Sequence, residues 1–143
     1  MDPSQHPLVQ NLMSLHLPTR DYVVAGSGPL LAHGLKQEVG DLDIVARGRA
    51  WEIITALAPP IPAPSGHGRM ALLFDGAIEA FDMWLPGTCE RDELIEEAEL
   101  IHGIPFSPLR RVLHWKQLYD RSKDRDDVVR IRRYLAVSGE PLH

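Results

Sequence analysis

The chain has 143 residues and a mass of 16.0 kDa, which is enough for one domain with a sizeable core and too little for two. Hydrophobic residues (44%) and charged residues (24%) occur at ordinary globular levels, so the composition excludes disordered, collagen-like and coiled-coil proteins. A single cysteine, Cys89, excludes an internal disulfide framework and a cysteine-only zinc site. We therefore expect a single domain over residues 1–143, with a core at about 20–106 and C-terminal helices at about 107–137.

The net charge of −5 is unevenly distributed along the chain. Residues 110–133 contain nine of the fifteen Lys and Arg residues, against four Asp. A basic segment beside an acidic body is what a nucleotide site needs, because metal-binding carboxylates and phosphate-binding cations must converge there. The alternative is an arginine-rich helical surface whose charges are solvated.

The N-terminal sequence MDPSQHPLVQ has an acid and prolines where a secretion signal has a basic start and an apolar run. No apolar stretch approaches the length that spans a membrane. We expect a cytoplasmic protein without a membrane partner.

Apolar periodicity and chain breakers predict the elements of the first half of the chain. Leu8, Leu12 and Leu15 have helical spacing, and Pro18 ends that helix. A β-branched segment then runs into Gly26-Ser27-Gly28, which breaks the strand before a second helix. The predicted elements are a helix at 4–17, a strand at 22–25, a helix at 30–35, a strand at 41–46 and a helix at 50–58.

The second half begins with a proline- and glycine-rich loop at residues 59–68. Two apolar strand patterns then flank Asp75-Gly76, the dipeptide preferred in two-residue hairpin turns. The predicted elements are strands at 70–74 and 77–84, a helix at 90–100, an extended segment at 101–106, and helices at 108–121 and from 124 onward. Together these elements predict an α/β (α+β) fold, in which helices cover a small mixed β-sheet and two helices close the chain.

Asp41 and Asp43 are the first candidate functional residues. They are two positions apart in a predicted strand, so both carboxylates point to one face of the sheet. Two close like charges are unfavourable unless they are solvated, protonated or bridged by a cation, and oxygen-rich pairs suit Mg²⁺. The alternative is an exposed strand end whose aspartates follow a turn.

Gly26 and Ser27 form a second candidate site between a strand and a helix. The backbone amides, the hydroxyl and the positive end of a helix dipole all favour an anion such as phosphate. The alternative is a tight turn that needs glycine for its backbone alone. The sequence contains no Walker loop, and Leu31 stands where a dinucleotide-binding fingerprint has its third glycine.

The segment VVAGSGPLLAHGLKQEVGDLDIVA, followed by a further acid on a later strand, resembles the nucleotidyltransferase superfamily with the polymerase-β-like core. It is similar to small bacterial members of the minimal, AbiEii-like and aminoglycoside-modifying types. The resemblance covers residues 20–84, and the segment WKQLYDRSKDRDDVVRIRRYL is similar to the helical ending of the small bacterial proteins.

The resemblance implies a role for each candidate residue. Asp41 and Asp43 would hold two Mg²⁺ ions, and a third acid would bind metal or accept the proton of the acceptor hydroxyl. Glu79 is favoured for that third acid over Asp82, because it lies between apolar residues of its strand. Gly26 and Ser27 would hold the β- and γ-phosphates. Lys116 and Lys123 could reach the triphosphate, unless they are ordinary surface lysines.

The function implied is Mg²⁺-dependent transfer of a nucleoside monophosphate from a nucleoside triphosphate, with ATP as the expected donor, to an acceptor hydroxyl. The acceptor stays open among small molecules, RNA and proteins, and a homodimer is compatible with the short chain. The alternative from another class is a non-catalytic module of the same fold that binds a nucleotide or a partner protein, as in toxin–antitoxin systems.

Overall fold

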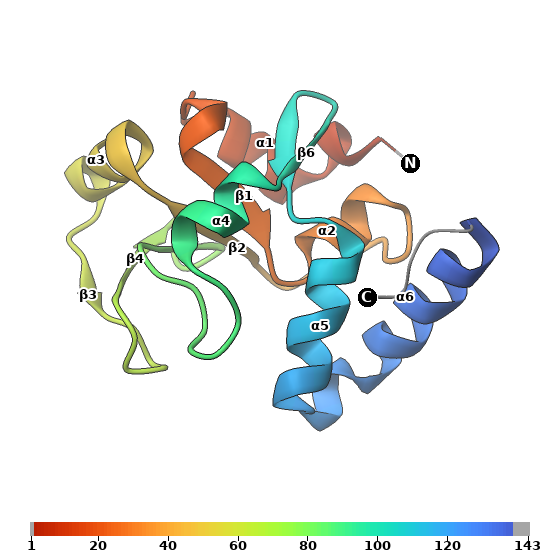
Figure 1. Cartoon of the computed structure of the whole chain (residues 1–143). Coiled ribbons are helices and arrows are strands. Elements are labelled where there is room, and N and C mark those ends of the chain that lie inside the picture. Colours follow the sequence, from red (N-terminus) through yellow and green to blue (C-terminus); the bar gives the residue numbers. More distant parts are fainter. Residues whose placement is uncertain (1, 139–143) are drawn as a thin grey trace.

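The computed structural model describes residues 2–138 as a mixed α+β fold built on one sheet (Figure 1). The strands are β1 (Tyr22–Ala25), β2 (Leu42–Ala46), β3 (Ile61–Pro62), β4 (Arg69–Leu73), β5 (Ile78–Phe81), β6 (Glu99–Ile101) and β7 (Ile104–Phe106). They lie in the order β3-β4-β5-β2-β1-β7-β6. The β1–β2 pair is antiparallel, whereas β5 runs parallel to β2 and β7 runs parallel to β1. The predicted fold class and mixed sheet are confirmed.

The two central strands are covered on both faces, which explains their continuous runs of apolar residues. All four residues of β1 are buried. Val23 and Val45 pack in the cluster on one face, whereas Val24 and Ile44 pack in the larger cluster on the other. β-branched residues suit such a strand because their side chains pack well on a pleated surface.

Six α-helices surround this sheet within residues 2–138. They are α1 (Pro7–Met13), α2 (Gly28–Ala32), α3 (Gly48–Leu57), α4 (Arg91–Glu96), α5 (Leu109–Tyr119) and α6 (Arg125–Ser138). Helices α1 and α3 contribute to the larger core cluster, and α4 packs on the opposite face. A third cluster joins α5 and α6 to α2, so this helix pair stands side by side at one end of the sheet (Figure 1). No helix in this part of the chain is both long and apolar enough to cross a membrane.

Two predicted helices are shorter in the structure. A 3₁₀ turn at Pro3–Gln5 precedes α1, which begins after His6 because Nδ1 of that imidazole accepts the amide hydrogen of Leu8 at 3.2 Å. Helix α4 ends at Glu96, and the following residues 99–101 form β6 instead of a helical turn. Pairing of β6 with β7 outweighs the helix preference of the acidic segment.

Four further predictions on the strands need correction. The strand predicted at 77–84 ends at Phe81, so Asp82 lies just beyond β5. The loop at 59–68 contains β3, which pairs with the exposed edge of β4. Asp41 lies just before β2 and not within it. The turn between β4 and β5 has four residues, because Leu73 pairs with Ile78 and leaves residues 74–77 between them.

Candidate active site

Strands β2 and β5 bring three carboxylates to one place. Asp43 on β2 is paired in register with Glu79 on β5, and Asp41 precedes Asp43 by two positions. One carboxylate oxygen from each residue lies within 4.8 Å of the other two. Asp41 is exposed and the other two are half-buried, so the group lies at the surface end of the sheet. We call these three residues the acidic cluster.

The acidic cluster is short of positive charge. Burial, followed by the charges of Asp41 and Glu79, raises the pKa of Asp43 to about 7. Burial and the charge of Asp41 also raise the pKa of Glu79 above its ordinary value. Both shifts report the cost of ionising neighbouring acids together. A divalent cation would remove that cost, and the all-oxygen donor set fits Mg²⁺, which binds one or two carboxylates and completes its shell with water or phosphate.

The backbone after β1 runs directly against this cluster. Gly26 has φ +62°, a left-handed conformation that favours glycine, and a Cβ added there would lie 2.5 Å from Oδ2 of Asp43. Gly26 is therefore required both for the bend and for the space beside the carboxylate. The helix that follows, α2, has only five residues, so its dipole adds little to anion binding.

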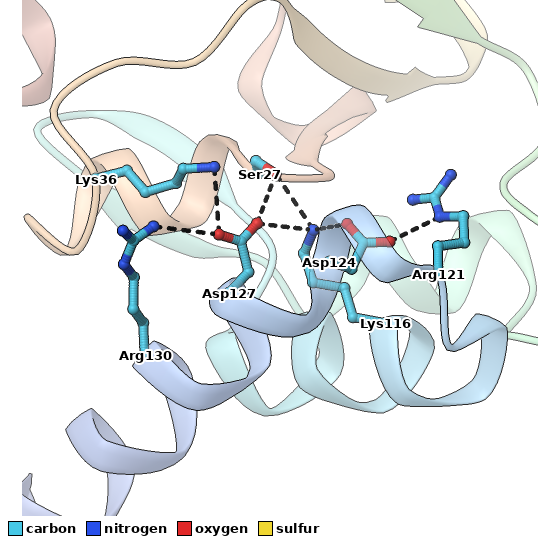
Figure 2. Close-up of polar contacts among 7 residues, drawn as sticks. All are labelled: Ser27, Lys36, Lys116, Arg121, Asp124, Asp127 and Arg130. Carbon is cyan, nitrogen blue, oxygen red and sulfur yellow. Dashed lines mark hydrogen bonds and ion pairs between the residues drawn. The ribbon is translucent and has the colours of Figure 1, made fainter.

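Lys116 is buried beside Ser27 (Figure 2). Its side chain is 1% exposed, which rules out the surface-lysine alternative. The ammonium Nζ donates to Oδ1 of Asp124 at 2.8 Å and to Oγ of Ser27 at 3.3 Å, and it lies 3.2 Å from Oδ2 of Asp127. The hydroxyl of Ser27 in turn donates to Oδ2 of Asp127 at 3.3 Å. The predicted phosphate-binding serine and lysine thus lie together, held by two acids of the C-terminal segment.

These two acids also hold three further cations (Figure 2). Asp127 is contacted by Lys36 at 3.2 Å and by Arg130 at 3.6 Å. Asp124 accepts a 2.7 Å hydrogen bond from Nε of Arg121. Burial acts to raise the pKa of Asp124, but hydrogen bonds from Lys116 and Arg121 outweigh it and hold the pKa below its ordinary value. Positive charge is therefore concentrated beside Ser27 in fixed positions.

Two acids of the acidic cluster, Asp41 and Asp43, share one hollow of about 200 Å³ with Ser27 and several basic groups. Residues that line it include Ser27, Lys36, Asp41, Asp43, Lys116 and Lys123. Lys123 makes no ion pair with any residue between 2 and 138. A ligand with several negative charges could contact the cations there while a divalent ion joins it to Asp41 and Asp43.

Asp82, the alternative third acid, lies outside the acidic cluster. Its carboxylate accepts two hydrogen bonds from Arg69. The backbone N–H of Arg69 donates to Oδ1 at 2.7 Å, and the side-chain Nε donates to Oδ2 at 3.2 Å. These bonds fasten the end of the β4–β5 hairpin. Of the two candidates, only Glu79 is close to Asp41 and Asp43.

The sequence analysis placed Asp124 at the start of the last helix and gave neither Asp124 nor Asp127 a role in the site. A usable signal was present in the spacing of α6. Asp127, Ile131 and Leu135 recur every four residues and share one helical face, and the two apolar members are buried in the cluster with α5. An acid on such a face needs a cationic partner, and Lys116 supplies it.

Comparisons with protein-family models, curated proteins and solved structures found no match to this chain. The chemistry of the site therefore follows from its residues alone. Three acids offer oxygen ligands to divalent cations, and the adjoining hollow presents lysines and a hydroxyl to anionic groups.

Proposed function

We propose that the protein is an Mg²⁺-dependent nucleotidyltransferase that moves a nucleoside monophosphate from a nucleoside triphosphate, with ATP as the expected donor, to an acceptor hydroxyl. The observation that carries this proposal is that Asp41 and Asp43 of the acidic cluster line the same hollow as Ser27 and Lys116. The resemblance of the Gly-Ser and Asp-x-Asp segments to the polymerase-β-like superfamily supports it. We also propose that the protein acts in the cytoplasm, where nucleoside triphosphates are abundant.

The chain's own residues have distinct roles in this reaction. Asp41 and Asp43 hold Mg²⁺, which when bound neutralises the triphosphate and stabilises the departing pyrophosphate. Ser27, Lys116 and Lys123 bind the β- and γ-phosphates. Because Lys116 is fixed by two buried acids, its ammonium is positioned before the nucleotide arrives.

The transfer conserves atoms and charge. The acceptor oxygen bonds to the α-phosphorus, the bond from that phosphorus to the α,β-bridging oxygen breaks, and pyrophosphate leaves with the electron pair. The hydroxyl proton passes to the carboxylate of Glu79. Burial raises the pKa of this carboxyl above its ordinary value, which makes it a better proton acceptor than an exposed glutamate.

Calorimetric titration with ATP and Mg²⁺ tests the binding half of the proposal. Wild-type protein should bind ATP only with Mg²⁺, and Asp43→Asn should weaken that binding by more than about tenfold. Asp75→Asn, in an exposed turn outside the site, is the matched control and should bind as wild type does. Failure of wild type to bind ATP with Mg²⁺ would show the proposal to be wrong.

Release of pyrophosphate and transfer of α-labelled phosphate to a pool of RNA, protein or small molecules test the chemical half. Wild type should transfer label and Asp43→Asn should not. Binding without transfer to any pool would instead support the alternative, a non-catalytic nucleotide-binding module.

A further inference from the structure

Two hollows border the acidic cluster, and both include Asp41 and Asp43 in their walls. The first, described above, alone contains Gly26, Ser27 and Lys36. The second has a volume of about 270 Å³ and alone contains Glu79, Phe81, Trp84 and Leu85. We call the first, which is lined by Lys36 and Lys116 together with Asp124 and Asp127, the basic hollow, and we call the second the aromatic hollow. Asp41 and Asp43 form a wall that the two hollows share.

The geometry of phosphoryl transfer indicates which reactant each hollow binds. Attacking and leaving oxygens lie roughly in line on opposite sides of the phosphorus. If Asp41 and Asp43 fix the α-phosphate and the pyrophosphate leaves toward Ser27 and the basic hollow, the attacking hydroxyl must come from the other side. The aromatic hollow is the second space that Asp41 and Asp43 border, and its wall contains Glu79, the proton acceptor of the proposed reaction.

The aromatic wall is fixed by packing. Phe81 and Trp84 meet edge to face with ring centroids 5.7 Å apart, and Trp84 and Trp115 meet the same way at 5.6 Å. Trp84 and Trp115 are almost fully buried, so they support the wall and keep its shape, while the half-buried Phe81 and Leu85 lie nearer the opening. The accessible apolar part of this wall, at Phe81 and Leu85, can contact the flat face of a ring.

The charges of this hollow disfavour an anionic acceptor. The residues found only in it comprise three apolar side chains and one acid, Glu79. Two cations, Arg121 and Lys123, line both hollows, and Arg121 already donates a 2.7 Å hydrogen bond to Asp124. Three acids of this hollow, Asp41, Asp43 and Glu79, stand against these two cations, so an anionic acceptor would meet an excess of negative charge.

We propose that the aromatic hollow is the acceptor site and that it takes an uncharged, ring-bearing hydroxyl compound, either a phenol or a sugar-like alcohol. This inference rests on the proposed nucleotidyltransferase function. The volume of about 270 Å³ accommodates one or two rings, so any larger part of the acceptor extends into solvent. Aromatic contacts bind the ring face, and Glu79 receives the hydroxyl proton.

Matched pairs of probes that differ in charge test this inference. The phenols are 4-hydroxyphenylacetamide and 4-hydroxyphenylacetate, and the sugars are methyl glucoside and methyl glucuronide. Binding is measured by saturation-transfer NMR with Mg²⁺ and α,β-methylene ATP present. At least one neutral probe should bind, and its anionic counterpart should bind at least about tenfold more weakly. The identity of the neutral probe that binds distinguishes the phenol from the sugar-like acceptor.

Variants locate the bound probe. Leu85→Glu adds a charge to the aromatic hollow and should weaken binding of the neutral probe by about tenfold or more, with unchanged affinity for α,β-methylene ATP. Phe81→Leu keeps an apolar side chain but removes the aromatic ring, and it should also weaken binding of the neutral probe. Leu100→Glu, on an exposed position of β6, is the control and should bind as wild type does.

Several outcomes would overturn the inference. These are no binding of either neutral probe, equal binding of neutral and anionic probes, or loss of nucleotide affinity in Leu85→Glu, which would place the nucleobase in this hollow. Each leaves the proposed function intact if wild type still binds α,β-methylene ATP with Mg²⁺. Failure of the nucleotide itself to bind would refute the proposed function instead.

Discussion

Asp43 and Glu79 stand directly opposite each other on the parallel strands β2 and β5. Partners in such a ladder point to the same face of the sheet, and the backbone hydrogen bonds on either side prevent them from moving apart. Like charges in opposite positions destabilise a sheet. The fold thus holds together two acids that repel each other, and this repulsion has measurable consequences.

The first consequence is a dependence of stability on pH in the absence of divalent cations. The pKa of Asp43 is about 7 in the folded chain against an ordinary value of 3.8, so between these values the folded state keeps a proton that the unfolded state releases. The free energy of unfolding should therefore fall as pH rises through this window. Urea titrations in chelator at about pH 5 and about pH 8 measure the fall.

Asp43→Asn should reduce this slope, because the amide does not ionise. Mg²⁺ should stabilise wild type more at about pH 8 than at about pH 5, since it binds the ionised carboxylates. An equal slope in wild type and Asp43→Asn would contradict the assignment of the repulsion to Asp43.

Gly26→Ala should weaken binding of ATP with Mg²⁺ by more than about tenfold, as measured by calorimetry. The added Cβ would lie 2.5 Å from Oδ2 of Asp43 and would displace that carboxylate. Gly34→Ala is the matched control, because Gly34 also has a positive φ (+73°) but has no atom within 4 Å of an added Cβ. Both variants carry the left-handed strain of about 1–2 kcal/mol, so only a displaced Asp43 explains a difference in binding.

Lys116→Met should lower the free energy of unfolding by about 3–5 kcal/mol, because it leaves Asp124 and Asp127 buried without their shared cation. Lys36→Met is the comparison. Lys36 also contacts Asp127 but is 28% exposed, so its removal should cost about 1 kcal/mol or less. Urea unfolding measures the free energy of unfolding of both variants. Equal decreases would show that the burial of Lys116 does not determine its contribution to stability.

Phe106→Ala should destabilise the fold by about 3–5 kcal/mol without changing the site. The ring is fully buried in the larger core cluster, next to Val24 of β1. Leu100→Ala, at a side chain that is 67% exposed, should change stability by less than about 0.5 kcal/mol. Thermal and urea unfolding measure the stability of both variants against wild type. A small loss in Phe106→Ala would mean that the core refills the cavity.

The elements that the sequence predicted well are those specified by nearby residues. β1 is a β-branched run that ends at a glycine bend, and the β4–β5 hairpin has apolar strands on both sides of a turn. The elements that it missed depend on partners far away or on competing turns. β3 exists only by pairing with β4. A two-residue turn with positive φ at His102 and Gly103 divides the expected extended segment 101–106 and pairs β7 with β6, which replaces the end of the expected helix.

The same distinction applies to the site. The two-residue spacing of Asp41 and Asp43 is local, so the sequence alone predicts that their carboxylates lie near one another. The position of Lys116 is not local, because α5 must fold back on the bend after β1 to bring it to Ser27. The apolar periodicity of a helix does not show which distant segment packs against that helix. A buried lysine and a surface lysine therefore look alike in the sequence.

The hydrogen bond from Ser27 to Asp127 joins residues one hundred positions apart. During synthesis on a ribosome, strands β1, β2 and β5 emerge long before α6, so the three acids can assemble on a nascent chain that still lacks Asp127. Loop-closure entropy also makes so distant a contact slow to form. Ligand affinity that requires Ser27 and Lys116 in place should therefore be gained only in the last stage of folding, after the sheet itself is complete.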